Sequence, residues 1–62
     1  MSQSEAMMQI MAIRAQTEVM GANDYEGSAF LNLEERLKNG KITPEEALQE
    51  AGDILQNKQD YH

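Results

Sequence analysis

A chain of 62 residues can form only one small domain, because at this size folding buries only about 60% of the surface that the unfolded chain exposes. Cysteine is absent and the single histidine, His62, is the last residue, which excludes a disulfide framework and any expected zinc-binding set. Eleven acidic residues against five Lys and Arg give a formal net charge of −6, and the dispersed basic residues exclude phosphate-driven nucleic-acid binding.

The apolar runs are too short for a membrane span, which needs roughly 20 residues. The N-terminal stretch Met1-Ser2-Gln3-Ser4-Glu5 lacks the basic flank of a secretory signal, so we expect a cytoplasmic protein with no membrane partner. Small scaffolds without a disulfide or metal commonly gain stability from a partner. We therefore expect a partner protein or a second copy of the chain, and neither a cofactor nor a small-molecule substrate.

The first expected helix runs from about Glu5 to Met20, through residues that are mostly good helix formers. Ser2 followed by Glu5 has the spacing of a capping box, and Ser4 is an alternative cap. Gly21 stands where a glycine commonly terminates a helix. The capping pattern and the glycine together predict a helix of about four turns.

At about 100° per residue, this helix carries two apolar stripes, whereas a surface helix needs one. The first stripe consists of Met8, Met11, Ala12, Ala15 and Val19. The second consists of Ala6, Ile10, Ile13 and Met20, interrupted only by Thr17. Either the helix is central and buries both stripes in its own domain, or one stripe contacts another chain. For a contact with another chain, the candidate interface residues are Met7, Met8, Ile10, Met11 and Ile13.

The second expected helix follows a turn. Asn23 caps it, with Glu26 closing a capping box, and Ser28 is an alternative cap. Asn39-Gly40 terminates it. Its apolar face recurs at helical spacing and consists of Ala29, Phe30, Leu33 and Leu37.

The third expected helix starts at Thr43, where Thr43 and Glu46 form another capping box and Pro44 occupies the first helical position. Its apolar face consists of Ala47, Leu48, Ala51, Ile54 and Leu55. An exposed acidic stripe consists of Glu46, Glu50 and Asp53. We expect a polar, frayed tail from about residue 57.

These elements predict an all-α fold: a small three-helix domain over residues 1–62, with a long Met-rich N-terminal helix and two shorter helices. Catalysis is not expected. The only histidine is terminal, and paired carboxylates need an enclosing pocket that raises their pKa values. The sequence therefore predicts a non-enzymatic protein without catalytic or metal-ligating residues.

The stretch Asn23-Asp24-Tyr25-Glu26-Gly27 resembles the inhibitory motif of Fic adenylyltransferase antitoxins of the VbhA type. That motif reads Ser or Thr, three residues, Glu, and then Gly or Asn. Glu26-Gly27 matches its end, whereas its Ser/Thr position falls on Ala22, which has no hydroxyl group. If the chain acts as these antitoxins do, its inhibition depends on Glu26 alone.

The flanks of the motif resemble the same family. Arg14 and Ala15 in the preceding helix are similar to the family's lead-in. Downstream, Gly40-Lys41-Ile42-Thr43-Pro44-Glu45-Glu46 is similar to the Gly-Glu-Ile-Ser/Thr-x-Glu-Glu entry into the family's last helix. The likeness covers roughly residues 12–56.

The resemblance implies an antitoxin that blocks ATP binding. In that family the motif's glutamate pairs with an active-site arginine that otherwise holds the ATP γ-phosphate, and such pairs are charge-assisted and often bidentate. The implied partner-binding residues are Asn23, Tyr25, Glu26 and Gly27, with Glu26 inhibitory and Tyr25 an apolar anchor. The residues alone leave another interpretation open, in which Glu26 is only a capping residue and Tyr25 lies at the core edge.

We therefore expect a small acidic regulator that acts by stoichiometric protein binding, in its sharpest form an antitoxin of a Fic adenylyltransferase. The alternative is a phage or mobile-element inhibitor of another bacterial protein. Such an inhibitor is either a homodimer that pairs through the Met-rich helix or an acidic decoy whose Glu46, Glu50 and Asp53 imitate phosphates.

Overall fold

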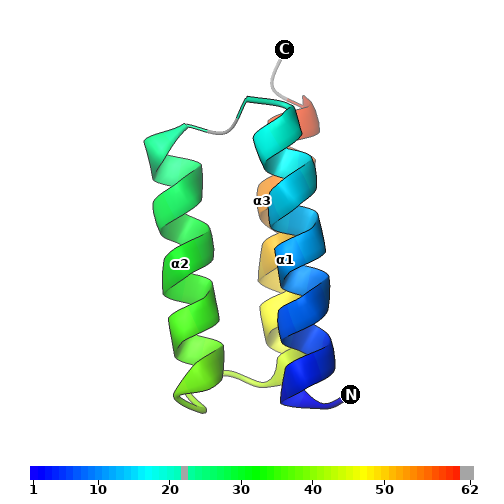
Figure 1. Ribbon diagram of the computed structural model, residues 1–62, viewed down its shortest axis with the longest axis vertical. Coiled ribbons are helices and arrows are strands. Elements are labelled where there is room, and N and C mark those ends of the chain that lie inside the picture. Colours follow the sequence, from blue (N-terminus) through cyan, green and yellow to red (C-terminus); the bar gives the residue numbers. More distant parts are fainter. Residues whose placement is uncertain (22, 61–62) are drawn as a thin grey trace.

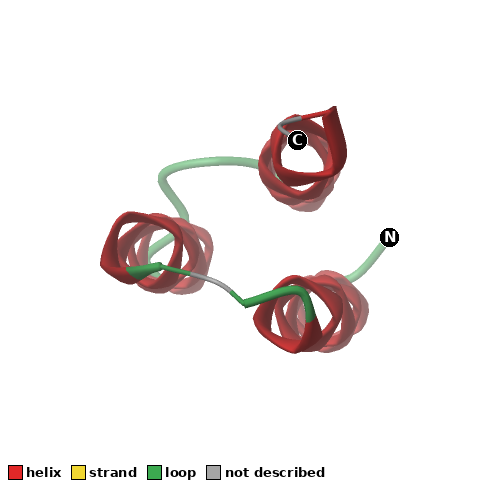
Figure 2. Cartoon of the chain, turned by 90° about the horizontal axis from the view of Figure 1, so that it is seen from above, coloured by secondary structure: helices red, strands yellow, loops and turns green. Residues whose placement is uncertain are grey.

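The computed structural model describes residues 1–21 and 23–60, and within this part the chain forms three helices and no strand. Helix α1 spans Gln3–Val19, α2 spans Asp24–Lys38 and α3 spans Pro44–Asp60. The helices run up, down and up, and the connections between them are short (Figure 1). Figure 2 shows them at the corners of a triangle. The expected all-α three-helix fold is confirmed for the described residues.

Side-chain caps fix the beginnings of α1 and α3, as the sequence predicts. The backbone N–H of Glu5 donates to Ser2 Oγ at 3.1 Å. At α3, the N–H of Glu46 donates to Thr43 Oγ1 at 3.1 Å, and the N–H of Thr43 donates to Glu46 Oε1 at 3.0 Å. Pro44 occupies the first helical position, where its missing N–H costs no hydrogen bond.

Two expectations about helix ends are wrong. The alternative caps Ser4 and Ser28 lie inside α1 and α2, because Ser2 and Asn23 already satisfy the first N–H groups of those helices. The tail expected to fray from about residue 57 is helical through Asp60, so α3 has 17 residues like α1 and is not the shorter helix that the sequence predicts.

Glycines end α1 and α2 in the left-handed conformation. Gly21 has a φ of +86° and Gly40 a φ of +73°, a region that costs other residues roughly 1–2 kcal/mol. After α2, the N–H of Gly40 donates to the carbonyl of Leu37 and the N–H of Lys41 donates to the carbonyl of Arg36. These bonds form a Schellman motif, which satisfies two of the last carbonyls of α2.

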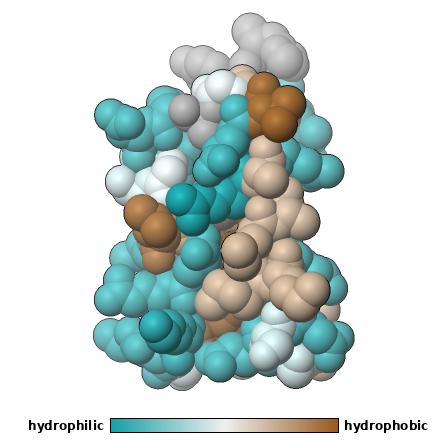
Figure 3. Space-filling view, viewed as in Figure 1, coloured by the Kyte–Doolittle hydropathy of each residue, from teal (hydrophilic) through white to brown (hydrophobic). Residues whose placement is uncertain are grey.

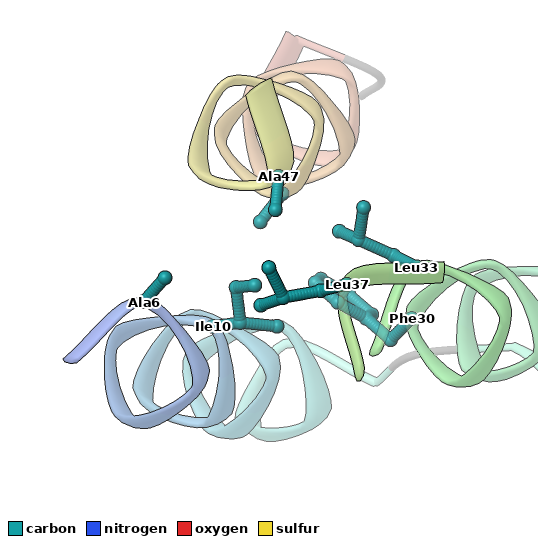
Figure 4. Close-up of a cluster of buried hydrophobic side chains, with 7 residues drawn as sticks. Ala6, Ile10, Phe30, Leu33, Leu37 and Ala47 are labelled. Carbon is teal, nitrogen blue, oxygen red and sulfur yellow. The ribbon is translucent and has the colours of Figure 1, made fainter. Parts of the chain in front are cut away.

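The core lies between the helices and is small. Figure 4 shows side chains from α1, α2 and α3 converging on one centre. The buried apolar residues are Ala6, Ile10, Phe30, Leu33, Leu37, Ala47 and Ala51. Phe30, Leu33 and Leu37 come from α2, α1 contributes Ala6 and Ile10, and α3 contributes only the alanines Ala47 and Ala51. Small side chains allow two helices to approach closely, and α1 makes its most extensive contact with α3.

Only one of the two stripes of α1 faces this core. Ala6, Ile10 and Thr17 are fully buried, and the Thr17 hydroxyl donates to the carbonyl of Ile13 at 2.9 Å. On the opposite side, Met8 is 71% exposed and Met11 is 56% exposed. The interpretation in which α1 is central and buries both stripes in its own domain is therefore wrong.

No helix in the described ranges is both long and apolar enough to cross a membrane.

Candidate functional site

A hollow of about 600 Å³ lies where the α1–α2 turn meets the last turns of α3, at the upper end of the molecule in Figure 1. Its lining residues are Met20, Asn23, Tyr25, Glu26, Ala29, Ile54, Asn57 and Lys58. The structure thus brings together three of the four residues expected to bind a partner. The fourth, Gly27, is half-buried in the first turn of α2, and the motif position Ala22 lies outside the described residues.

Glu26 is held by hydrogen bonds at the start of α2. Its Oε1 accepts the N–H of Asn23 at 2.8 Å and Lys58 Nζ at 3.0 Å, while the N–H of Glu26 donates to Asn23 Oδ1 at 2.9 Å. The N–H of Asn23, and secondarily Lys58, lowers the pKa of the Glu26 carboxyl below its ordinary value. Its side chain is only 13% exposed. The capping box expected from the sequence is confirmed, and Glu26 is a fixed anion at neutral pH.

Lys58 is the residue of this hollow that the sequence did not indicate. Its Nζ donates to the carbonyl of Gly21 at 2.8 Å as well as to Glu26, so one lysine joins the end of α3 to the turn that follows α1. The indication that Lys58 lies here comes from the topology of the bundle. In an up-down-up bundle, the last turn of the third helix lies beside the first connection, where carbonyls of a helix end favour a cation.

Tyr25 is 80% exposed beside this ion pair. Tyr25 therefore does not lie at the edge of the core, and the alternative interpretation of the sequence that places it there is wrong. The ring is on the first turn of α2, next in sequence to the fixed carboxylate, and it lines the hollow together with the apolar side chains of Met20 and Ile54. Aromatic rings in such settings can contact both apolar groups and cations.

The residues expected to form an interface on the first helix lie on different sides of α1. Ile10 is fully buried, and Met7 and Ile13 are half-buried against the core. Placing Ile10 at an interface is therefore wrong, because it already packs inside the chain. Met8 and Met11 are exposed. They belong to a surface that we term the outer face of α1, which consists of Met8, Met11, Ala12, Ala15 and Val19.

The acidic stripe of α3 is partly engaged by the chain itself. Glu50 forms a two-point contact with the Arg36 guanidinium, at 2.8 and 3.2 Å. This hydrogen bonding to Glu50 raises the pKa of Arg36. Glu46 accepts the capping bond from Thr43. Both carboxylates are thus committed to internal contacts, which leaves the stripe poorly suited to imitate phosphates.

The hollow is suited to recognition more than to proton transfer. A general acid or base works best with a pKa near the operating pH, whereas the pKa of Glu26 is lowered. Among residues 1–21 and 23–60, no group of three or more His, Asp or Glu side chains is arranged to hold a metal ion. Comparisons with protein-family models, curated proteins and solved structures find no significant match to this chain.

Proposed function

We propose that this protein is a non-enzymatic regulator that acts in the cytoplasm by binding one partner protein stoichiometrically through the hollow at the α1–α2 turn. The observation that carries the proposal is the pairing of Tyr25, 80% exposed, with the fixed carboxylate of Glu26. Tyrosine is among the residues that contribute most to binding energy at protein interfaces. A fixed carboxylate next to it supplies a negative charge and a hydrogen-bond acceptor with a set orientation.

The chemistry of the hollow favours an arginine on the partner. A guanidinium can form charge-assisted hydrogen bonds with Glu26 and lie against the ring of Tyr25 at the same time. Asp24, which precedes Tyr25 in the first turn of α2, adds a second negative charge. The net charge of −6 also attracts a basic partner at long range.

A narrower form of the proposal is inhibition of a Fic adenylyltransferase. The match of Glu26-Gly27 to the end of the antitoxin motif, on a turn that also presents Tyr25, supports it. In this form, the toxin's arginine competes with Lys58 for the Glu26 carboxylate. The chain leading into the motif is not one continuous helix, since α1 ends at Val19 and Gly21 adopts a left-handed conformation.

The general proposal is tested by affinity capture from cells with the wild-type protein, Tyr25→Ala and Leu31→Ala. Leu31 is the matched control, because it is a 55% exposed apolar residue of α2 that does not line the hollow. A specific partner should be retained by the wild type and by Leu31→Ala, and weakened by about 10-fold or more for Tyr25→Ala. Equal capture by the wild type and Tyr25→Ala would contradict the role of the hollow.

The Fic form is tested by adding the protein to a Fic adenylyltransferase and measuring adenylylation. Glu26→Gln is the informative variant, because glutamine can still serve in a capping box while the charge is removed. We expect inhibition by the wild type and loss of inhibition with Glu26→Gln. Full inhibition by Glu26→Gln would reject this form and leave the general proposal standing.

A further inference from the structure

The outer face of α1 lies on the opposite side of the helix from the core and is independent of the hollow. None of its five residues carries a charge, and each is exposed, Val19 to 89%. In Figure 3 the apolar colours form a strip along α1 that reaches the upper end of the helix. Contiguous apolar strips of this kind on a small protein mark interaction surfaces.

We propose that the outer face of α1 binds the same face of a second copy in antiparallel orientation, which gives a symmetric homodimer. A basic partner would gain no electrostatic attraction at a face without acidic residues. Two copies, each with a net charge of −6, repel one another, and they can approach most easily through a surface where neither presents a charge. The neutral face is such a surface.

The order of large and small side chains along the outer face of α1 favours a second copy as the partner, in antiparallel orientation. In an antiparallel pair centred between positions 11 and 12, Met8 near the midline of the face lies opposite Ala15 of the other copy, whereas Met11, at one edge, lies beside Met11 of the other copy. Met8 of each copy then fills the space left by Ala15 of the other copy, which is the alternation that close packing needs. A parallel pair would place Met8 on Met8 and Ala15 on Ala15 along the midline, which leaves a gap between the two Ala15 side chains.

The edges of the face agree with this arrangement. The twofold axis brings equivalent edges together, so Glu5 of one copy lies within about 3 Å of the level of Gln16 on the same edge of the other. On the other edge, Glu18 lies level with Ser4 of the second copy. Arg14 is held in its own chain by Glu18 and Glu34, both at 3.2 Å. The antiparallel pairing therefore brings no like charges directly opposite one another along these edges.

The size of the face predicts a weak dimer. From Ser4 to Val19 the helix rises about 22 Å, and the strip is about one helix, or 10 Å, wide. Such a contact has a footprint of about 220 Å², below the roughly 600 Å² on each partner at which specific, stable interfaces begin, and in the range of weak, transient complexes. We therefore expect an equilibrium between monomer and dimer that shifts with protein concentration.

The mass of the full chain in solution tests the association. In sedimentation equilibrium from about 10 µM to about 1 mM, a range that covers weak complexes, the average mass should rise from 7.0 kDa toward twice that value. Met11→Glu should remain monomeric throughout. Leu31→Glu adds the same charge at an exposed position on α2 and should dimerise like the wild type. Tyr25→Ala should also dimerise normally, which separates this test from that of the hollow.

Cysteine variants test the direction, since the chain has no cysteine of its own. Ala12→Cys lies next to the proposed twofold axis and should form a disulfide-linked dimer under mild oxidation. Val19→Cys residues would lie about 11 Å from the axis on each side and about 22 Å from one another, so they should stay reduced. Efficient crosslinking through Val19→Cys would indicate a parallel pair and overturn the proposal.

Two other results would overturn it. A wild-type mass that stays at 7.0 kDa up to about 1 mM would show that the outer face does not bind a second copy. Monomers that instead bind lipid vesicles, with loss of binding for Met11→Glu, would assign the face to a membrane surface. Circular dichroism of each variant verifies that the helices are retained.

Discussion

The hollow and the outer face of α1 are two exposed surfaces built on different physical principles. In the hollow, Lys58 and Asn23 hold the Glu26 carboxylate from two segments far apart in the chain. The outer face comes from a single helix, and its side chains do not take part in the hydrogen bonds that fix the fold. The hollow can therefore offer a partner an oriented, charged hydrogen-bonding group, whereas the outer face offers only apolar surface area.

This difference separates what each surface can recognise. A network of hydrogen bonds around a fixed anion discriminates between partners, because a partner without a matching cation leaves the charge poorly compensated. An apolar strip on one helix discriminates mainly by shape and adapts through its methionines. We expect selective binding at the hollow and weak, concentration-dependent association at the outer face.

The largest expected effect comes from the core that supports both surfaces. Phe30 is fully buried, and its replacement by alanine should cost about 3–5 kcal/mol. Small domains are stable by only about 5–15 kcal/mol, so Phe30→Ala should lose much of its helical signal at 25 °C by circular dichroism. Leu31→Ala, at the neighbouring exposed position, should melt within a few degrees of the wild type. Equal melting of both variants would contradict the assigned core.

Much of this core was predictable, because it follows from local pattern. Phe30, Leu33 and Leu37 recur at helical spacing, and the caps at Ser2, Asn23 and Thr43 are set by residues within three positions. These features need no knowledge of the rest of the chain. The local pattern therefore sufficed for the class of the fold and for the start of α3, whereas it left two candidate caps each for α1 and α2.

The hollow and the outer face of α1 depend on tertiary contacts, which the local sequence pattern does not reveal. Both stripes of α1 are apolar, and only packing against α2 and α3 decides that Ile10 faces inward and Met11 outward. The sequence predicts a frayed tail at Lys58, because the partners of this residue, Gly21 and Glu26, are 37 and 32 positions away. No local signal distinguishes a lysine that bridges such a distance from one that points into solvent.

A smaller effect should distinguish the two surfaces directly. Asn23→Ala removes the side chain that caps α2 and the geometry that holds Glu26, at a cost of about 1 kcal/mol. Urea denaturation should show this loss, and binding at the hollow should weaken with it. The mass distribution in sedimentation should not change, since the outer face does not include the cap. Asn23→Ser, which retains a capping oxygen, should recover most of the stability.

The smallest expected effect is a dependence of stability on pH that comes from the caps. The pKa values of Glu26 and Glu46 are lowered, by the N–H of Asn23 and by Thr43 respectively, from an ordinary value of 4.5. The unfolded chain therefore binds more protons than the folded chain in acid. Their stabilising contribution is fully present above about pH 4.5 and is lost as the pH falls through the lowered pKa values.

Glu26→Gln separates the hollow from the outer face in this pH range. It should flatten the decline of the unfolding free energy between about pH 5 and pH 3, because one of the two perturbed carboxyls is gone. Met11→Gln, a substitution on the outer face, should leave the slope of the wild type unchanged, since no titratable group belongs to that face. If Glu26→Gln kept the full slope, the lowered pKa of Glu26 would not contribute to stability. The anion in the hollow would then be held less firmly than its hydrogen bonds indicate.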